Sequence, residues 1–497
     1  MKILLLLILL LPIAAAAVVF LVRFPSRKGL LLFTGGALLA ETALVTLLAC
    51  LGDVSMTLFS MTDTLVVALE TDAVARVFML TAVWVFLPAG VFAFRYLEHS
   101  AGEGAFPEHR FYGFFLLSLA ALMGMDLASN LVTLYFFFEM LTLLSMPLVL
   151  HDRTETAFAA ALKYLFYSIA GALAGLFAIL VLTHAAGTAS FAPGGHADAF
   201  AASGNRGLLL AAVFVGIVGF GAKAGLYPLH GWLPTAHPAA PAPASAILSG
   251  VIAKAGVLAI LRMIYFYAGP AFLSGTWVQT VLLILALLTV FMGSMTAWRE
   301  KILKKRLAYS SVSQISYALF GLFLMNAQGL TGGLLQVVFH AAAKSCLFLA
   351  AGSFIFHTGK ISVTDVKGLG RKLPVTFGAF TMAALSLIGI PPFAGFVSKW
   401  YLALGAMDTG LPVFGWLGPV VLLVSALLTA GYLLPVVVDA FFPGNTDRAA
   451  DAPGGEGGAL MALPLILLAA AVLVFGLFSG LLTPYFLDLA SNVLAAG

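Results

Sequence analysis

Long apolar runs recur along the whole chain and alternate with short polar stretches. A run of about 20 apolar residues can cross the hydrocarbon core of a bilayer as an α-helix, because each helical residue adds about 1.5 Å of rise. The pattern therefore predicts an all-α membrane protein with fourteen transmembrane helices, at residues 3–23, 29–51, 74–97, 111–126, 129–150, 160–184, 207–233, 241–267, 276–297, 305–325, 332–357, 374–404, 413–437 and 460–487.

The first run could instead be a secretory signal, since Lys2 precedes an apolar core followed by several alanines. Its apolar residues continue as far as Val22, so we expect a retained first helix.

Cationic residues gather in the odd-numbered loops between the predicted helices, and the loops on the opposite side of the membrane have only Lys2, Arg76 and Arg206. The positive-inside rule then places both termini outside the cell membrane, which requires an even number of helices. The cationic residues of the odd loops are Arg23, Arg27, Lys28, Arg95, Arg110, Arg153, Arg299, Lys301, Lys304, Lys305, Arg306, Lys360, Lys367, Arg371, Lys372 and Arg448.

Charged residues make up only 9% of the chain, yet several lie inside the predicted helices. An ionisable group at bilayer depth costs a few kcal/mol or more, so it usually faces a polar interior and marks an ion path. Lysine suits proton transfer, because burial makes its charged form costly and lets the amine release a proton. The residues concerned are Glu139, Lys163, Lys223, Lys254, Lys344 and Lys399.

An internal repeat relates two parts of the chain. ALKYLFYSIAGALAGLF around Lys163 matches AAAKSCLFLAAGSFIF around Lys344, and the next helix in each part is interrupted, in FGAKAGLYPLHGWLP and in IGIPPFAGFVSKWYL. The offset is five helices, and an odd offset inverts the second copy in the membrane, as in many transporters. The interruptions at Gly225–Pro228 and Pro391–Pro392 free backbone carbonyls beside Lys223 and Lys399. Simple packing kinks are the alternative interpretation.

The segments LVTLYFFFEMLTLLSMPLVL, ALKYLF and GFGAKAGLYPLHGWLPTAHPAAPAPASAILSGVIAKAGVLAILR resemble the proton-conducting antiporter-like membrane subunits. This family includes subunits of respiratory complex I (NADH–quinone oxidoreductase), Mrp-type sodium/proton antiporters and membrane-bound hydrogenases. The resemblance covers roughly residues 70–440. It implies two inverted five-helix bundles (helices 4–8 and 9–13), with helices 7 and 12 broken. The corresponding divisions are 1–110 for helices 1–3, 111–267 and 276–437 for the two repeats, and 438–497 for a loop and helix 14.

The resemblance also implies roles for individual residues. Glu139 matches the carboxylate that pairs with the helix 7 lysine, here Lys223, and Lys254 matches a lysine that relays protons toward the second half. His340 and Lys344 match the polar bridge between the halves, and Lys399 matches the terminal lysine. In the second half, Ser316 and Tyr317 stand where an acidic counterpart of Glu139 is expected, so the two half-channels should differ.

Four other residues have two interpretations each. Lys163 could join the pathway or extend to the cytoplasmic surface. His230 and His237 could gate proton uptake or simply hold the loop between helices 7 and 8. Glu41 could be functional or form a buried hydrogen bond. The loops 185–206 and 443–458 are expected to be surface linkers.

No redox chemistry is visible in the sequence: it has no phosphate-binding glycine loop and no CxxC pair. Cys50 and Cys346 fall inside predicted helices, so we expect no disulfide, metal or cofactor. The expected partners are other membrane subunits (antiporter-like and small hydrophobic ones) and, in some complexes, a hydrophilic redox arm. The expected ligands are protons, sodium ions as well in the antiporter type, and lipid, but not nucleic acid. Lys399 disfavours one complex I subunit type, which has glutamate there, and the end at Gly497 disfavours the largest type. The Mrp D type, the smaller complex I type and the hydrogenase type stay open, as do a stand-alone solute transporter and a non-conducting structural subunit.

Overall fold

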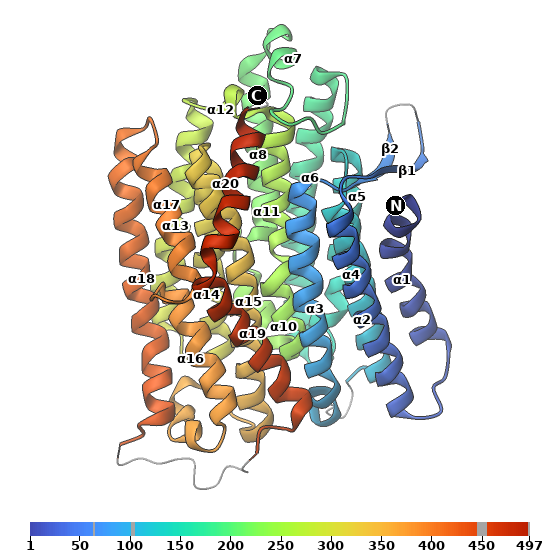
Figure 1. Cartoon of the computed structure of the whole chain (residues 1–497), viewed down its shortest axis with the longest axis vertical. Helices are drawn as coiled ribbons and strands as arrows, with labels where there is room; N and C mark the ends of the chain where they lie inside the picture. Colours follow the sequence, from blue (N-terminus) through green and yellow to red (C-terminus); the bar gives the residue numbers. More distant parts are fainter. Residues whose placement is uncertain (63–64, 101–104, 445–454, 496–497) are drawn as a thin grey trace.

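The computed structural model describes residues 1–62, 65–100, 105–444 and 455–495. It is nearly all-helical, and twelve of its described helices are long and apolar enough to cross a membrane. They stand side by side in one bundle (Figure 1). The chain is therefore an integral, multi-pass membrane protein, as the apolar runs predict.

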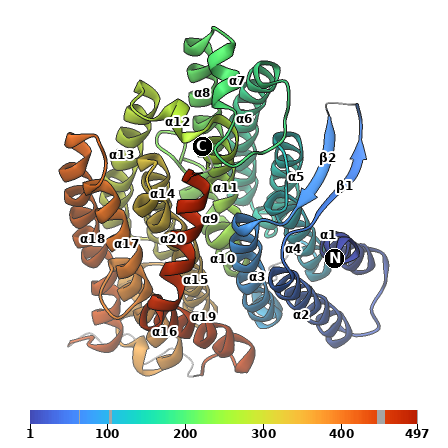
Figure 2. The ribbon, with the colours of Figure 1, turned by 45° about the horizontal axis from the view of Figure 1, so that its top comes forward.

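The N-terminal part packs along one side of the bundle (Figure 2). It consists of α1 (Lys2–Leu21), α2 (Arg27–Leu51) and α3 (Ala73–Ser100). Between α2 and α3 lies an antiparallel hairpin, β1 (Ser55–Ser60) and β2 (Val66–Glu70), which the hydropathy pattern did not predict. Its strands are too short and too polar to register as an apolar run.

The next part of the chain contains α4 (Glu108–Asp126), α5 (Leu131–Val149), α6 (Glu155–Ala186) and α8 (Arg206–Ala224). The interruption expected near Gly225 is present: α8 ends there, with φ of +83° at Gly225, and the chain resumes helical structure in α9 (Leu233–Ala239). Residues 242–268 form one helical span that is buried throughout its length. This span changes winding along its length, through α10 (Ala242–Ile247), the π-helix η1 (Leu248–Ile252), α11 (Lys254–Leu261) and the π-helix η2 (Arg262–Ala268).

The C-terminal part begins with α13 (Trp277–Arg299), α14 (Leu303–Leu324) and α15 (Ala327–Thr358), and the last two are almost completely buried. The second interruption separates α16 (Pro374–Ile388) from α17 (Ala394–Met407), with φ of +94° at Gly389. The remaining long helices are α18 (Pro412–Phe441), α19 (Ala459–Leu477) and α20 (Ser479–Ala495).

Three details differ from the sequence-based expectation. The last predicted helix, 460–487, is divided at Phe478 between α19 and α20. The 185–206 linker contains the short helix α7 (Ala197–Ala202), and it is held against the end of η2 by a 2.9 Å hydrogen bond from the Ala192 amide to the Phe266 carbonyl. Most of the 443–458 linker, with Arg448, lies outside the described residues.

Candidate functional site

The first group of polar side chains lies between α5 and α8. Lys223, in the last turn of α8, is completely buried, and its ammonium donates a 2.6 Å hydrogen bond to the Thr142 hydroxyl. The same nitrogen lies 4.8 Å from the centre of the Phe138 ring. Glu139 is half-buried on α5 and accepts a 3.4 Å hydrogen bond from Tyr135. Glu139 and Lys223 both lie in the part of the chain that the structure describes. They interact electrostatically but form no direct ion pair there.

The structure therefore shows the Glu139–Lys223 pair in a separated arrangement. A carboxylate stabilises a nearby ammonium, and the stabilisation grows as the charges approach each other in a low dielectric. The hydroxyl of Thr142 occupies the contact that a carboxylate would take in a closed pair. Small shifts of α5 relative to α8 would therefore change how strongly Lys223 holds its proton.

Lys254 begins α11, next to this group. The two helices approach each other closely, because a β-carbon on Gly256 would lie 2.6 Å from the Ala224 nitrogen. Lys254 is buried and donates to the carbonyl of Ser249 in the π-helix η1. The Ser249 hydroxyl in turn bonds to Ser311 of α14 at 2.7 Å.

The long helix α15 contributes the next members of the row. Lys344 is fully buried and donates a 2.8 Å hydrogen bond to the Leu307 carbonyl of α14. His340, one turn earlier, is also buried, and neither of its ring nitrogens has a hydrogen-bond partner in the described protein. His340 interacts electrostatically with Lys254, Lys344 and Lys399. The structure thus brings these two residues of α15 together with Lys254 and Lys399, which lie far from them in the sequence.

Lys399 ends the row at the second interruption. It is half-buried on α17, and its ammonium donates to the carbonyls of Leu387 and, at 2.8 Å, of Ile388. The ring of Tyr317 lies 5.3 Å from the same nitrogen. Tyr317 therefore does stand beside this lysine, in the position where the sequence lacks an acidic residue. The two lysines differ in placement, because Lys223 precedes its interruption and Lys399 follows its own.

The remaining candidates are more scattered. Lys163 is exposed on α6 and interacts electrostatically with His230. His230 is half-buried and stacks on Tyr227 at 5.6 Å. His237 is completely buried against Phe348, with ring centres 4.6 Å apart, and both of its ring nitrogens are unpartnered in the described protein. Glu41 is buried in α2, and its carboxylate accepts no hydrogen bond from a described residue, so the expected buried hydrogen bond is not present.

Sequence reasoning missed an uncharged polar chain that joins α14, α15 and α17. The Ser398 hydroxyl donates to the Gln336 side-chain oxygen at 2.7 Å, and the Gln336 amide donates to Gln314 at 3.0 Å. All three side chains are buried. Glutamine is rare in the apolar face of a membrane helix, so two glutamines in such segments were an available signal.

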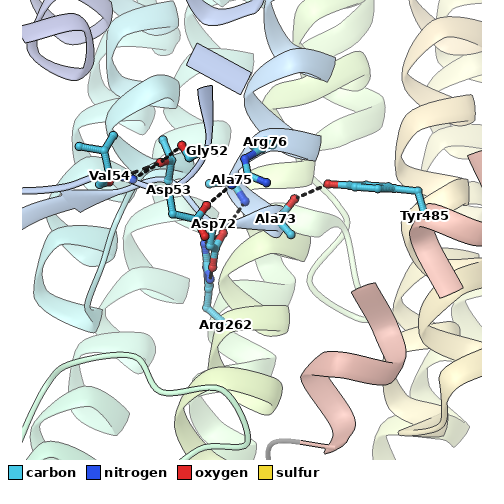
Figure 3. A network of polar contacts seen from close by, with 10 residues as sticks. Gly52, Asp53, Val54, Asp72, Ala73, Ala75, Arg76, Arg262 and Tyr485 are labelled. Carbon is cyan, nitrogen blue, oxygen red and sulfur yellow. Dashed lines mark hydrogen bonds and ion pairs between the residues drawn. The ribbon is translucent and has the colours of Figure 1, made fainter. Parts of the chain in front are cut away.

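A second missed cluster lies at the start of η2, directly after α11 (Figure 3). Arg262 is 3% exposed and donates two hydrogen bonds, of 2.5 and 2.9 Å, to Asp72, which precedes α3. Burial opposes ionisation of Asp72, but the Arg262 guanidinium holds the pKa of that carboxyl below its usual value. Asp126, at the end of α4, is buried nearby within electrostatic range of Arg262.

Comparison with known proteins assigns the family. Residues 128–429 match the family described as NADH:quinone oxidoreductase/Mrp antiporter, transmembrane. The chain is 37% identical over 407 residues to NADH-quinone oxidoreductase subunit N of Desulforudis audaxviator, covering 79% of this chain and 78% of that one. It is 32% identical over 344 residues to Hydrogenase-4 component B of Escherichia coli, covering 67% and 50%.

The fold agrees with this assignment. The solved structure of the Mrp complex from Dietzia sp. DQ12-45-1b contains a chain that superposes with a TM-score of 0.83 at 23% identity, covering 99% of this chain and 97% of that one. The chain thus belongs to the NADH:quinone oxidoreductase/Mrp antiporter family of membrane subunits, as the sequence motifs predict.

Proposed function

We propose that the chain is a proton-translocating subunit of a multi-subunit membrane complex. Protons move along Glu139, Lys223, Lys254, Lys344, His340 and Lys399. The observation that carries this proposal is the group of buried ionisable side chains on the deeply buried helices α11 and α15. Lys254 and Lys344 interact electrostatically with each other, and His340 interacts with both. Ionisable residues at membrane depth are costly and mark proton relays.

The chain crosses the membrane fourteen times in this proposal, with inverted five-helix repeats at 111–267 and 276–437. The flanking segments 1–110 and 438–497 hold the remaining helices. Contacts between loops support the alternation of successive loops between the two ends of the bundle. At one end, the Glu70 amide bonds to the Leu127 carbonyl and the Leu131 amide to the Ala189 carbonyl, both between even-numbered loops. At the other end, the Phe106 amide bonds to the His151 carbonyl and the Val363 amide to the Lys301 carbonyl, both between odd-numbered loops.

The positively charged odd loops then face the cytoplasm, and both termini lie outside the cell membrane. The partners are other antiporter-like and small hydrophobic subunits. Proton transport by the complex would be driven by a redox arm, as the names of the complex I and hydrogenase relatives suggest, or by a sodium gradient, as the Mrp family name suggests.

The test is proton transport by the assembled complex in liposomes, with Lys223→Ala and Lys399→Ala in the full chain. Lys301→Ala is the matched control, because Lys301 is an exposed loop lysine. We expect transport to fall about 10²-fold in the first two variants, because each removes a group that passes protons, and to stay unchanged in the control. Normal transport in both buried-lysine variants would favour a structural subunit. Full solute transport by the isolated chain would favour a stand-alone transporter.

A further inference from the structure

A cavity of about 210 Å³ opens at the end of the bundle that holds the odd-numbered loops. It lies where the two halves of the chain meet. Its lining includes Tyr96 of α3, Asp152 after α5, Pro238 of α9, Lys304 of α14 and Ile361 after α15. The cavity is outside the row of ionisable residues described above, and two of its lining residues are charged.

The two charged residues are placed as a pair. Lys304 is only 5% exposed, and its ammonium donates to the carbonyl of Ala240, between α9 and α10. Asp152 interacts electrostatically with Lys304, and one of its carboxylate oxygens is buried without a hydrogen-bond partner in the described protein. Burial raises the pKa of the Asp152 carboxyl above its usual value, and the nearby Lys304 ammonium opposes this shift. Such a carboxyl exchanges protons more readily near neutral pH.

His237 immediately precedes a residue of the cavity wall. Its neighbour Pro238 lines the cavity, and Ala240, three residues later, accepts the Lys304 hydrogen bond. The histidine ring is completely buried, and neither nitrogen has a described protein partner. Buried polar atoms in native proteins are nearly always satisfied, by protein or by water.

On its other side, His237 reaches the central row. Its ring stacks on Phe348, which lies one helical turn after Lys344 on α15. The imidazole interacts electrostatically with Lys304 at the cavity and with both Lys344 and Lys254 in the row. A neutral imidazole has one donor and one acceptor nitrogen, so it can take a proton on one side and release another on the opposite side.

We infer that this cavity is a proton-uptake site, in which Asp152 and Lys304 form the mouth and His237 passes protons to Lys254 and Lys344. The inference rests on the proposed function and adds to it the entry from which protons reach the centre of the row. A proton from water binds the Asp152 carboxylate, moves to the free nitrogen of His237, and the proton on the other nitrogen leaves for a neutral lysine. The positive charge of the Lys304 ammonium makes a nearby protonated, positively charged His237 unfavourable, so the proton does not stay on the histidine.

The experiment blocks the cavity in the full chain within its complex. Ile361→Cys is introduced together with Cys50→Ser and Cys346→Ala, and proton transport is measured before and after a membrane-impermeant, positively charged thiosulfonate reagent. Lys360→Cys is the matched control, since Lys360 is the exposed neighbour that does not line the cavity. We expect the reagent to slow transport several-fold in the first protein, only from the face with the odd loops, and to leave the control unchanged.

A second measurement tests the histidine. His237→Ala should lower transport about 10²-fold, and added imidazole should restore part of it, because the small base can enter the cavity and take the place of the side chain. Unchanged transport after cavity modification, or in His237→Ala, would overturn the uptake site. If Lys223→Ala still abolished transport in the same preparation, the proposed function would stand without this route. If that variant also transported normally, the proposed function itself would fail.

Discussion

Lys399 donates a 2.8 Å hydrogen bond from its ammonium to the carbonyl of Ile388, across the interruption between α16 and α17. A second bond goes to the Leu387 carbonyl. The last carbonyls of a helix have no partner within the helix, and a lysine is well suited to satisfy them. The lysine is therefore both a proton-carrying candidate and the cap of a broken helix.

These two roles can be separated. Lys399→Arg keeps a cation and its donors but does not release a proton, so we expect an assembled, stable complex with proton transport about 10²-fold lower. Lys399→Met should lose transport and also about 1–3 kcal/mol of stability, because two carbonyls lose their donor. Transport in liposomes and thermal unfolding in detergent measure the two effects. An arginine variant that transports normally would contradict proton carriage by Lys399.

Removal of the charge on Glu139 should weaken transport without unfolding the protein. Glu139→Gln keeps the side-chain shape, but Lys223 loses the carboxylate that stabilises its ammonium. We expect proton transport to drop about tenfold or more. Glu155→Gln, an exposed glutamate at the start of α6, is the control and should transport normally. Equal rates in both variants would argue against a role for the Glu139–Lys223 pair.

Replacement of Asp72 should destabilise the start of η2. Asp72→Ala leaves the Arg262 guanidinium buried without its carboxylate, and we expect a loss of about 1–3 kcal/mol, reduced by water because Asp72 is 29% exposed. The exposed Asp408→Ala is the control. Thermal unfolding in detergent measures both variants.

The same pair makes stability depend on pH in a defined direction. The pKa of Asp72 is lower in the folded protein than its ordinary value of 3.8. The contribution of ionised Asp72 to the stability of the folded protein is therefore complete above about pH 3.8. It is lost as the pH falls from there through the pKa that Asp72 has in the folded protein. The wild type should lose stability in that acid range more steeply than Asp72→Ala. Parallel pH curves for the two proteins would contradict this assignment.

Close contact between α8 and α11 requires a glycine. A β-carbon at position 256 would lie 2.6 Å from both the Ala224 nitrogen and the Phe220 carbonyl oxygen. Gly256→Ala should therefore force the helices apart and cost about 1–3 kcal/mol. Gly207→Ala, where a β-carbon meets nothing within 4 Å, should be neutral or slightly stabilising. Unfolding temperatures that do not differ between the variants would show that the helices can adjust freely.

Much of the fold was predictable because its signals are local. The apolar runs located most of the helices to within a few residues, and Gly225–Pro228 and Pro391–Pro392 marked the interruptions. The short hairpin between α2 and α3 was missed because its strands are too short to form an apolar run, and the division at Phe478 was missed because the residues around it stay apolar. The buried glutamines Gln314 and Gln336 are visible in the sequence, but an uncharged side chain disturbs a hydropathy pattern less than a charged one does.

Hydropathy, loop charge and motifs by themselves determined the membrane class, the family and most of the buried ionisable residues, because a bilayer imposes length and polarity on every spanning segment. Only the tertiary structure decided which of these residues meet. It left Lys163 exposed, placed Thr142 rather than Glu139 against Lys223, and brought His237 between a cavity and Lys344. Such contacts depend on how helices distant in sequence rotate and pack against each other, which no single helix encodes.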